Sequence, residues 1–377
     1  MLSSRQSKIN WGAYQPADWA SLIQIAVVEG VAPLIFQAFN SDGWPVAIPD
    51  ALRKALADEF YNTAATNLLL LEEAGRIFAC FAVAGIPAIP LKGIDLAGRL
   101  YPDVSLRPMG DLDILIRETD YLRAAHLLEE SGYVLEDALQ NLDPGLRRIV
   151  HYEANFNKAV PAPFHVELHW NLIGSQASRY QPQIEWFWQQ TTAGQIAGQP
   201  VRQLSSNAHL LYCAAHLMIK HGEREQRLIW FYDLRRLLEV ADSSLDWALI
   251  LAQARAFNWL PALVEALQGV QVRFARPLPA ALTGIWPDLL VQVETGAREN
   301  GVTQALTRWQ RTLAELSGLD WAARRKLIWF LLFPSAQYMR WRYNLSSVWL
   351  LPLYYPYRWL DITGEAWKTL WKWVKRK

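Results

Sequence analysis

The spacing of apolar positions divides the chain into three zones. From Asp18 to about Ala84, apolar residues recur at helical spacing, and Pro45–Pro49 splits this zone into two helical halves. From Ile86 to about Ile173, short alternating stretches predict strands separated by helices. From Ser205 onward the spacing is helical again. These patterns predict an α+β protein with a helical zone at 1–84, a sheet-containing core at 85–200 and a helical domain at 201–377.

The middle zone has the order β-α-β-α-β-β, which predicts a small mixed sheet with helices on one face. The second helix begins at Thr119 or Asp120, carries an apolar stripe of Leu122, Ala125 and Leu128, and ends at Gly132. The expected strands are Ile86–Leu91, Asp111–Ile116, Val150–Ala159 and Phe164–Leu172, and the first expected helix is Ile94–Tyr101.

The C-terminal zone is expected to be mostly helical. The predicted helices are Ser206–Lys220, Gln226–Val240, Trp247–Phe257, Pro261–Val270 and Gly301–Leu316, with Ser206 as a cap. The last fifty residues are rich in Trp, Tyr and Arg, and their pattern places helices there only loosely.

Composition limits the classes of function. The chain has 377 residues, of which 52% are hydrophobic and 19% charged, which is typical of a globular protein. Its net charge of +1 provides no field for binding nucleic acid, so no nucleic-acid partner is expected. Cys80 and Cys213 suit neither a disulfide framework nor a zinc site. There is no signal-peptide pattern and no apolar run of about 20 residues, so a cytoplasmic protein is expected.

The segment Arg107-Pro-Met-Gly-Asp111-Leu-Asp113-Ile-Leu-Ile116 carries the strongest chemical signal. Side chains alternate along a strand, so Asp111 and Asp113 project from the same face, roughly 6.5–7 Å apart at Cα. Two carboxylates on one face repel each other unless a cation lies between them, and Mg²⁺ prefers oxygen ligands. Because aspartate is disfavoured in strands, a metal site is favoured over a solvated strand face.

The segment Phe164–Asn171 supplies a third carboxylate. His165, Glu167, His169 and Asn171 share one face of the predicted strand, and the apolar residues share the other. If this strand pairs beside the aspartate strand, Glu167 completes a two-metal site with Asp111 and Asp113. Two alternatives are a polar face on an edge strand and a His165/Glu167/His169 site for Zn, Fe or Ni.

Other residues are candidates for binding phosphate. Lys92 and Gly93 form a strand-to-helix turn, where backbone N–H groups and a lysine can face an anion. Arg107 either reaches a phosphate or is an ordinary loop arginine. His216 and Lys220 share a helix face with His209 and Tyr212, which lines either the cleft or a packed polar surface.

Together these motifs resemble the polymerase-β-type nucleotidyltransferase superfamily. More narrowly, Leu91-Lys92-Gly93 with Arg107–Ile116, and the segment Leu210–Leu238, resemble the bacterial family of uncharacterised nucleotidyltransferases. The resemblance implies transfer of a nucleoside monophosphate from an NTP to an acceptor, assisted by Mg²⁺ or Mn²⁺. It implies that Asp111 and Asp113 bind metal, and that Glu167 binds metal or accepts a proton from the acceptor.

The acceptor is left open: a small molecule, a sugar, a peptide or a protein would each be compatible. The usual Gly-Ser turn of the superfamily is Lys92-Gly93 here, and this departure supports an alternative. In that alternative the chain is a catalytically degenerate binding or partner module, for example in a toxin–antitoxin pair or a biosynthetic cluster. The basic, amphipathic segment from Trp367 to Val374 suggests weak contact with a membrane surface, or docking on the protein itself.

Overall fold

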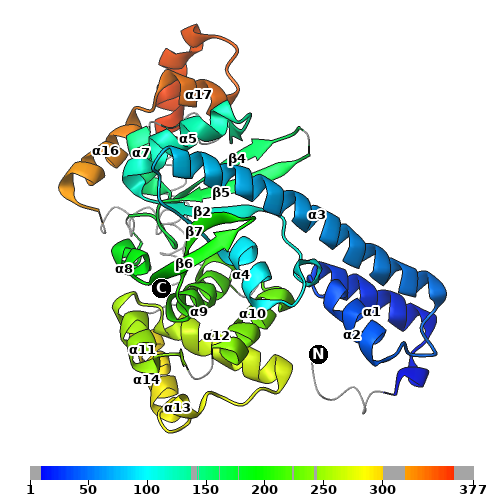
Figure 1. Cartoon of the computed structure of the whole chain (residues 1–377). Helices are drawn as coiled ribbons and strands as arrows, with labels where there is room; N and C mark the ends of the chain where they lie inside the picture. The colour runs from blue at the N-terminus through cyan, green and yellow to red at the C-terminus, as the bar shows by residue number, and fades with distance from the viewer. Residues whose placement is uncertain are drawn as a thin grey trace.

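The computed structural model describes residues 10–136, 142, 144–160, 162–176, 178–222, 225–241, 244–299 and 319–360. Within these residues the protein is α+β, as predicted, with helices before and after a five-stranded mixed sheet (Figure 1).

The N-terminal zone contains three long helices, whereas two were expected. They are α1 (Pro16–Val28), α2 (Ala32–Asp42) and α3 (Asp50–Val83), preceded by the short turn η2 (Trp11–Ala13). The additional break follows α1 at Gly30, whose φ of 72° an L-residue rarely adopts. Pro45–Pro49 separates α2 from α3, as the sequence indicated.

The main sheet has the strand order β1-β2-β5-β4-β3. β2 and β5 are parallel, and the other neighbouring pairs are antiparallel, so the sheet is mixed as expected. The short edge strand β3 was not predicted. The strands are β1 (Ala88–Pro90), β2 (Leu112–Ile116), β3 (Val134–Leu135), β4 (Glu153–Lys158) and β5 (Phe164–His169). The intervening helices are α4 (Lys92–Leu100), η3 (Val104–Leu106), η4 (Glu118–Asp120), α5 (Tyr121–Glu130) and α7 (Pro144–Val150).

The alternation along β2 separates a core face from a chemical face. Leu112, Ile114 and Ile116 pack against α3 and α5 in one apolar cluster, as the period-two pattern predicted. The predicted stripe of α5 was correct at Leu128, and Ala125 packs partly buried against the same cluster, but Leu122 is 61% exposed. Tyr121 and Ala124 are buried in its place.

A β-hairpin follows the main sheet and was missed in the sequence. After α8 (Ile184–Gln189), strands β6 (Thr191–Ile196) and β7 (Gln199–Leu204) pair antiparallel, and β7 lies beside β1 and α3. The hairpin therefore extends the layer that carries the site.

The C-terminal helices pack beside the N-terminal ones. A single apolar cluster includes Trp19 of α1, Leu210 of α9, Phe231 of α10 and Leu263 of α12. Ser205, rather than Ser206, caps α9 by accepting a hydrogen bond from the Ala208 N–H. The helices are α9 (Ser206–Ala215), the π-helix η5 (His216–His221), α10 (Leu228–Val240), α11 (Trp247–Ala256), α12 (Leu260–Phe274), α13 (Ala280–Thr283) and α14 (Trp286–Glu299).

The last described segment returns to the sheet side of the molecule (Figure 1). It contains α16 (Trp321–Leu332), α17 (Ala336–Tyr343), η7 (Val348–Leu350) and helical residues 351–360, and α16 packs on α7. The predicted helices Gly301–Leu316 and Trp367–Val374 lie outside the described residues. In the described part of the chain, no helix combines the length and apolarity needed to cross a bilayer.

Candidate active site

Two carboxylates face each other across neighbouring strands. Asp113 in β2 and Glu167 in β5 are register partners in the parallel pair, and alternation directs both side chains to the same face of the sheet. Asp113 is 2% exposed, and Glu167 is partly buried. The sequence analysis made this pairing the condition for Glu167 to join the aspartates, and the two strands are paired. The register places the two carboxylates close enough to act on one ligand.

His169 joins this pair two residues along β5, again on the same face. Its Nε2 lies 3.0 Å from Asp113 Oδ1 and 3.4 Å from Glu167 Oε2. Its Nδ1 lies 3.3 Å from Glu153 Oε2, outside hydrogen-bond geometry. Burial opposes the charged imidazole, but hydrogen bonds to Asp113 and Glu167 outweigh that effect and raise the pKa of His169. His169 therefore acts as an ion-pair partner of the carboxylates.

Lys92 projects into the same cluster from the turn between β1 and α4. The backbone of Lys92 has a φ of 47°, a value that residues other than glycine rarely adopt. Its Nζ lies 2.5 Å from Asp113 Oδ1, 3.6 Å from Glu167 Oε2 and 3.1 Å from His216 Nε2. Burial disfavours the ammonium, but the neighbouring carboxylates, Asp113 first, raise the pKa of Lys92 above its usual value.

The π-helix η5 supplies the opposite wall of the site. Single π-helical turns are frequent at functional sites, and this one directs His216 and Lys220 toward the sheet. Lys220 Nζ lies 3.0 Å from both oxygens of Glu153 and 3.3 Å from Glu167 Oε2. Burial and then the adjacent charge of Lys92 hold the pKa of His216 well below its usual value. His216 is therefore neutral and can accept a hydrogen bond from Lys92.

Asp111 precedes β2 and remains without a partner. No described side chain forms a hydrogen bond or an ion pair with its carboxylate, although it is partly buried. The charge of Asp113 and then burial raise the pKa of Asp111 to about 6. The charges of Lys92 and Arg107 lower this pKa, but they do not outweigh the effects of Asp113 and burial.

The donor set fits a hard cation. Four carboxylates (Asp111, Asp113, Glu153 and Glu167) face two lysines and His169, and Asp113, Glu167 and His169 each offer an atom within 4.8 Å of the others. Two members of this group of three are carboxylates, which are ligands that Mg²⁺ prefers, and His165 is not among its members. The arrangement therefore suits a Mg²⁺-type ion better than the expected His165/Glu167/His169 site for Zn, Fe or Ni.

Arg107 lies behind the site, where it joins β2 to the C-terminal helices. It is 6% exposed, and its Nη2 donates to Asp233 Oδ2 of α10 at 2.8 Å. Tyr101 donates to the other oxygen of Asp233 at 2.6 Å. Arg107 is therefore the cationic partner of the buried Asp233. In this structure the guanidinium contacts Asp233, and phosphate binding by Arg107 stays a prediction.

Two further residues position the loop before β2. Asn67, buried in α3, donates to the carbonyl of Arg107 at 2.9 Å and accepts from the Met109 N–H at 3.3 Å. A Cβ on Gly93 would lie 2.5 Å from Arg107 Nη1, so this position requires glycine for packing. The sequence analysis proposed Gly93 as part of the strand-to-helix turn. Only the fold reveals the role of Asn67, because its burial cannot be read from the sequence.

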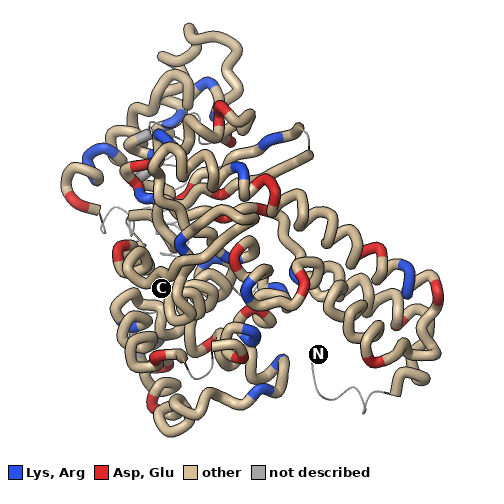
Figure 2. The backbone as a smooth tube through the Cα atoms, viewed as in Figure 1, with Lys and Arg blue, Asp and Glu red and all other residues tan. Residues whose placement is uncertain are grey.

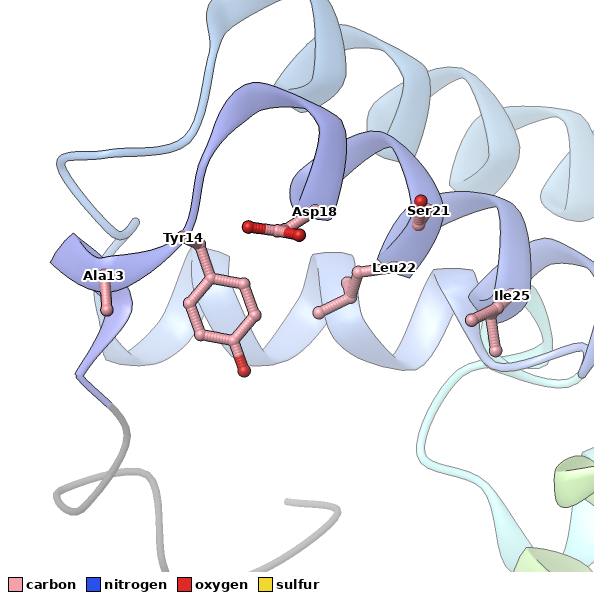
Figure 3. A pocket seen from close by; sticks show the side chains of 6 residues that line it. All are labelled: Ala13, Tyr14, Asp18, Ser21, Leu22 and Ile25. Atoms are coloured by element: carbon pink, nitrogen blue, oxygen red, sulfur yellow. The ribbon is translucent and has the colours of Figure 1, made fainter.

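A surface hollow at the start of α1, among the described residues, lacks such a cluster. The hollow in Figure 3 is lined by Ala13, Tyr14, Asp18, Ser21, Leu22 and Ile25 at the start of α1. Its one acidic side chain, Asp18, already accepts a hydrogen bond from the Gln15 N–H at 2.9 Å. The acidic cluster on β2 and β5 is therefore the better candidate for chemistry.

A mixed sheet with paired carboxylates beside a strand-to-helix turn is the arrangement of a nucleotidyltransferase. The family model described as uncharacterised nucleotidyltransferase matches residues 15–275, which is more than half of the chain. The protein therefore belongs to that family, and no curated relative matches it.

Two solved structures resemble parts of the fold. The antibiotic-resistance factor ANT(2'')-Ia is 16% identical with a TM-score of 0.36, and the match covers 54% of this chain and 98% of that protein. An antigenic nucleotidyltransferase-like protein from Paracoccidioides brasiliensis is 18% identical with a TM-score of 0.30, covering 58% and 98%. At these TM-scores neither similarity establishes a shared substrate.

Proposed function

We propose that the protein transfers a nucleoside monophosphate from an NTP to an acceptor, with the help of Mg²⁺ or Mn²⁺. The observation that carries this proposal is the register of Asp113 and Glu167 on parallel neighbouring strands, with Asp111 two residues before Asp113. Family membership supports the same reaction type. The acceptor, which attacks the α-phosphorus while pyrophosphate leaves, is a small molecule, a peptide or a protein.

Asp111, Asp113 and Glu167 would hold the metal, which supplies charge stabilisation for the phosphates when it is bound. Among these residues Glu167 is better suited to a ligand than to a base. Although burial raises its pKa, the hydrogen bond from His169 and the charge of Lys92 outweigh burial and lower it well below the usual range. A carboxylate with so low a pKa is a weak proton acceptor at neutral pH.

Lys92 and Lys220 are the proposed phosphate contacts. Both ammonium groups already lie at the carboxylates, and each can exchange a carboxylate oxygen for a phosphate oxygen. Gly93 follows Lys92 at the N-terminus of α4, where backbone N–H groups favour an anion. We assign His216 to orienting Lys92, because it is neutral and its Nε2 lies 3.1 Å from the Lys92 ammonium. Arg107 orients the loop before β2 through Asp233 and remains a candidate phosphate contact.

A second candidate function is binding without catalysis. Lys92 already pairs with Asp113 at 2.5 Å, and the turn lacks the serine that the superfamily commonly uses. In that case the site would bind a nucleotide and would not turn it over.

The two candidates differ in the release of pyrophosphate. Purified protein would be incubated with each NTP and Mn²⁺, and nucleotide binding and pyrophosphate would be measured together. Glu167→Gln is expected to abolish pyrophosphate release, and Glu294→Gln, at an exposed position on α14, is expected to retain it. Metal-dependent nucleotide binding without pyrophosphate under every condition would favour the non-catalytic module.

A further inference from the structure

Helix α16 exposes an apolar stripe to solvent. Its residues recur at helical spacing on one side, and Trp321 is 73% and Trp329 64% exposed. The stripe consists of Trp321, Ile328, Trp329, Leu332 and Phe333. The other side of α16 packs Ala323 and Leu327 against Leu146 and Ile149 of α7. The outer stripe is therefore an exposed apolar surface that a partner could cover.

A second stripe lies on the segment that follows α17. Trp349, Leu353, Tyr357 and Leu360 are spaced by four, four and three residues, and Trp349 is 90% exposed. The segments that carry the two stripes contact each other. The Trp359 indole donates to the Leu332 carbonyl at 2.8 Å, and its ring centroid lies 5.6 Å from that of Phe333. We call the residues of both stripes the aromatic face.

Basic residues accompany the aromatic face. Residues 319–360 contain six Lys or Arg, of which four are exposed, and one acidic residue, Asp320, which caps α16. Arg325 and Lys326 are exposed on α16, where 100° per residue places Arg325 between Trp321 and Trp329. Figure 2 shows these basic positions on α16 and those on α17, where Arg340 and Arg342 are exposed. This local charge contrasts with the net charge of only +1 for the whole chain.

We propose that the aromatic face docks on an anionic lipid surface. Tryptophan and tyrosine side chains favour the interface between water and lipid, and lysine and arginine near them are attracted to anionic headgroups. Single protruding side chains such as Trp349 suit insertion among headgroups, which needs no complementary pocket. In this proposal the aromatic face lies along the membrane surface. The described part of the chain contains no helix that could span the bilayer. This proposal does not depend on catalysis.

Vesicle co-sedimentation of the full chain tests this surface. The vesicles contain either phosphatidylcholine alone or phosphatidylcholine mixed with phosphatidylglycerol, at low and high salt. The test variant is Trp329→Glu/Trp349→Glu/Leu353→Glu, on the aromatic face. The matched control is Leu68→Glu/Leu69→Glu/Val83→Glu, which makes the same charge change at exposed apolar positions of α3. Thermal unfolding verifies that both variants fold.

Wild type and control are expected to bind vesicles that contain phosphatidylglycerol, more weakly at high salt, and the face variant is expected to lose at least about tenfold in affinity. Equal binding by the face variant and the control would overturn the proposal, even if another segment binds lipid. Failure of wild type to bind either vesicle would also overturn it. Self-association that the face variant abolishes, without vesicle binding, would instead assign the face to a second copy of the chain.

Discussion

Neutralising Asp111 should stabilise the metal-free fold. Asp113 and then burial raise the pKa of Asp111 from 3.8 to about 6, and the opposing charges of Lys92 and Arg107 offset this rise only in part. The folded state therefore binds a proton on Asp111 more tightly than the unfolded state does. Between pH 3.8 and about 6 the folded chain holds more protons, so this group's contribution to stability falls as pH rises.

The magnitude follows from the shift in pKa. Each pKa unit corresponds to about 1.36 kcal/mol, so a rise from 3.8 to about 6 costs the folded state about 3 kcal/mol above pH 6. Asp111→Asn removes the charge and keeps the shape of the side chain. We expect this variant to exceed wild type in unfolding free energy by up to about 3 kcal/mol at pH 7.5, with the difference vanishing below about pH 4.

Urea unfolding in the presence of a chelator, followed by circular dichroism across this pH range, measures the difference. Asp58→Asn is the control, because Asp58 is exposed on α3 and pairs only with Lys54, so its effect should stay within about 0.5 kcal/mol. Added Mn²⁺ should stabilise wild type more than Asp111→Asn. If Asp111→Asn were no more stable than wild type at pH 7.5 without metal, the electrostatic account of this site would be refuted.

Three further substitutions test the residues around the site. Lys92→Met should raise the affinity for Mn²⁺ at least about tenfold in titration calorimetry, because it removes the ammonium that lies 2.5 Å from Asp113. An unchanged affinity would contradict this expectation. Arg107→Ala should lower the unfolding free energy by about 3–5 kcal/mol in urea, because it leaves Asp233 buried without its cation; a loss below about 1 kcal/mol would argue against the pair. Gly93→Ala should lower the free energy of unfolding by about 1–3 kcal/mol in thermal unfolding, because the added Cβ would lie 2.5 Å from the Arg107 guanidinium. A neutral effect would show that the guanidinium moves aside at little cost.

The central strands could be predicted because alternation and charge agree there. Asp113 stands in an otherwise apolar strand that Asp111 precedes, and Glu167 stands in a strand where polar and apolar residues alternate, which identified both the strands and the chemical face. The contacts of His169 and Glu153 depend on the register of three strands, which the sequence pattern does not define.

The sequence analysis missed elements in which a residue has a backbone conformation that its type rarely adopts. The β6–β7 hairpin turns at Ala197 and Gly198, which have φ values of 47° and 76°. Such a turn usually contains Asn-Gly, and alanine conceals it. Lys92 likewise has a positive φ that its residue type does not suggest, so its position between the carboxylates could not be foreseen from the turn alone.

The most direct test of nucleotidyl transfer follows the label of α-³²P NTPs. Each NTP would be incubated with Mg²⁺ or Mn²⁺, purified protein and a lysate of the source cell, comparing wild type with Asp111→Asn, which is expected to remain folded. The account predicts metal-dependent transfer of label to an acceptor, or to the protein itself, with wild type and none with the variant. Undiminished transfer by Asp111→Asn, or no transfer by wild type with any NTP, would contradict it.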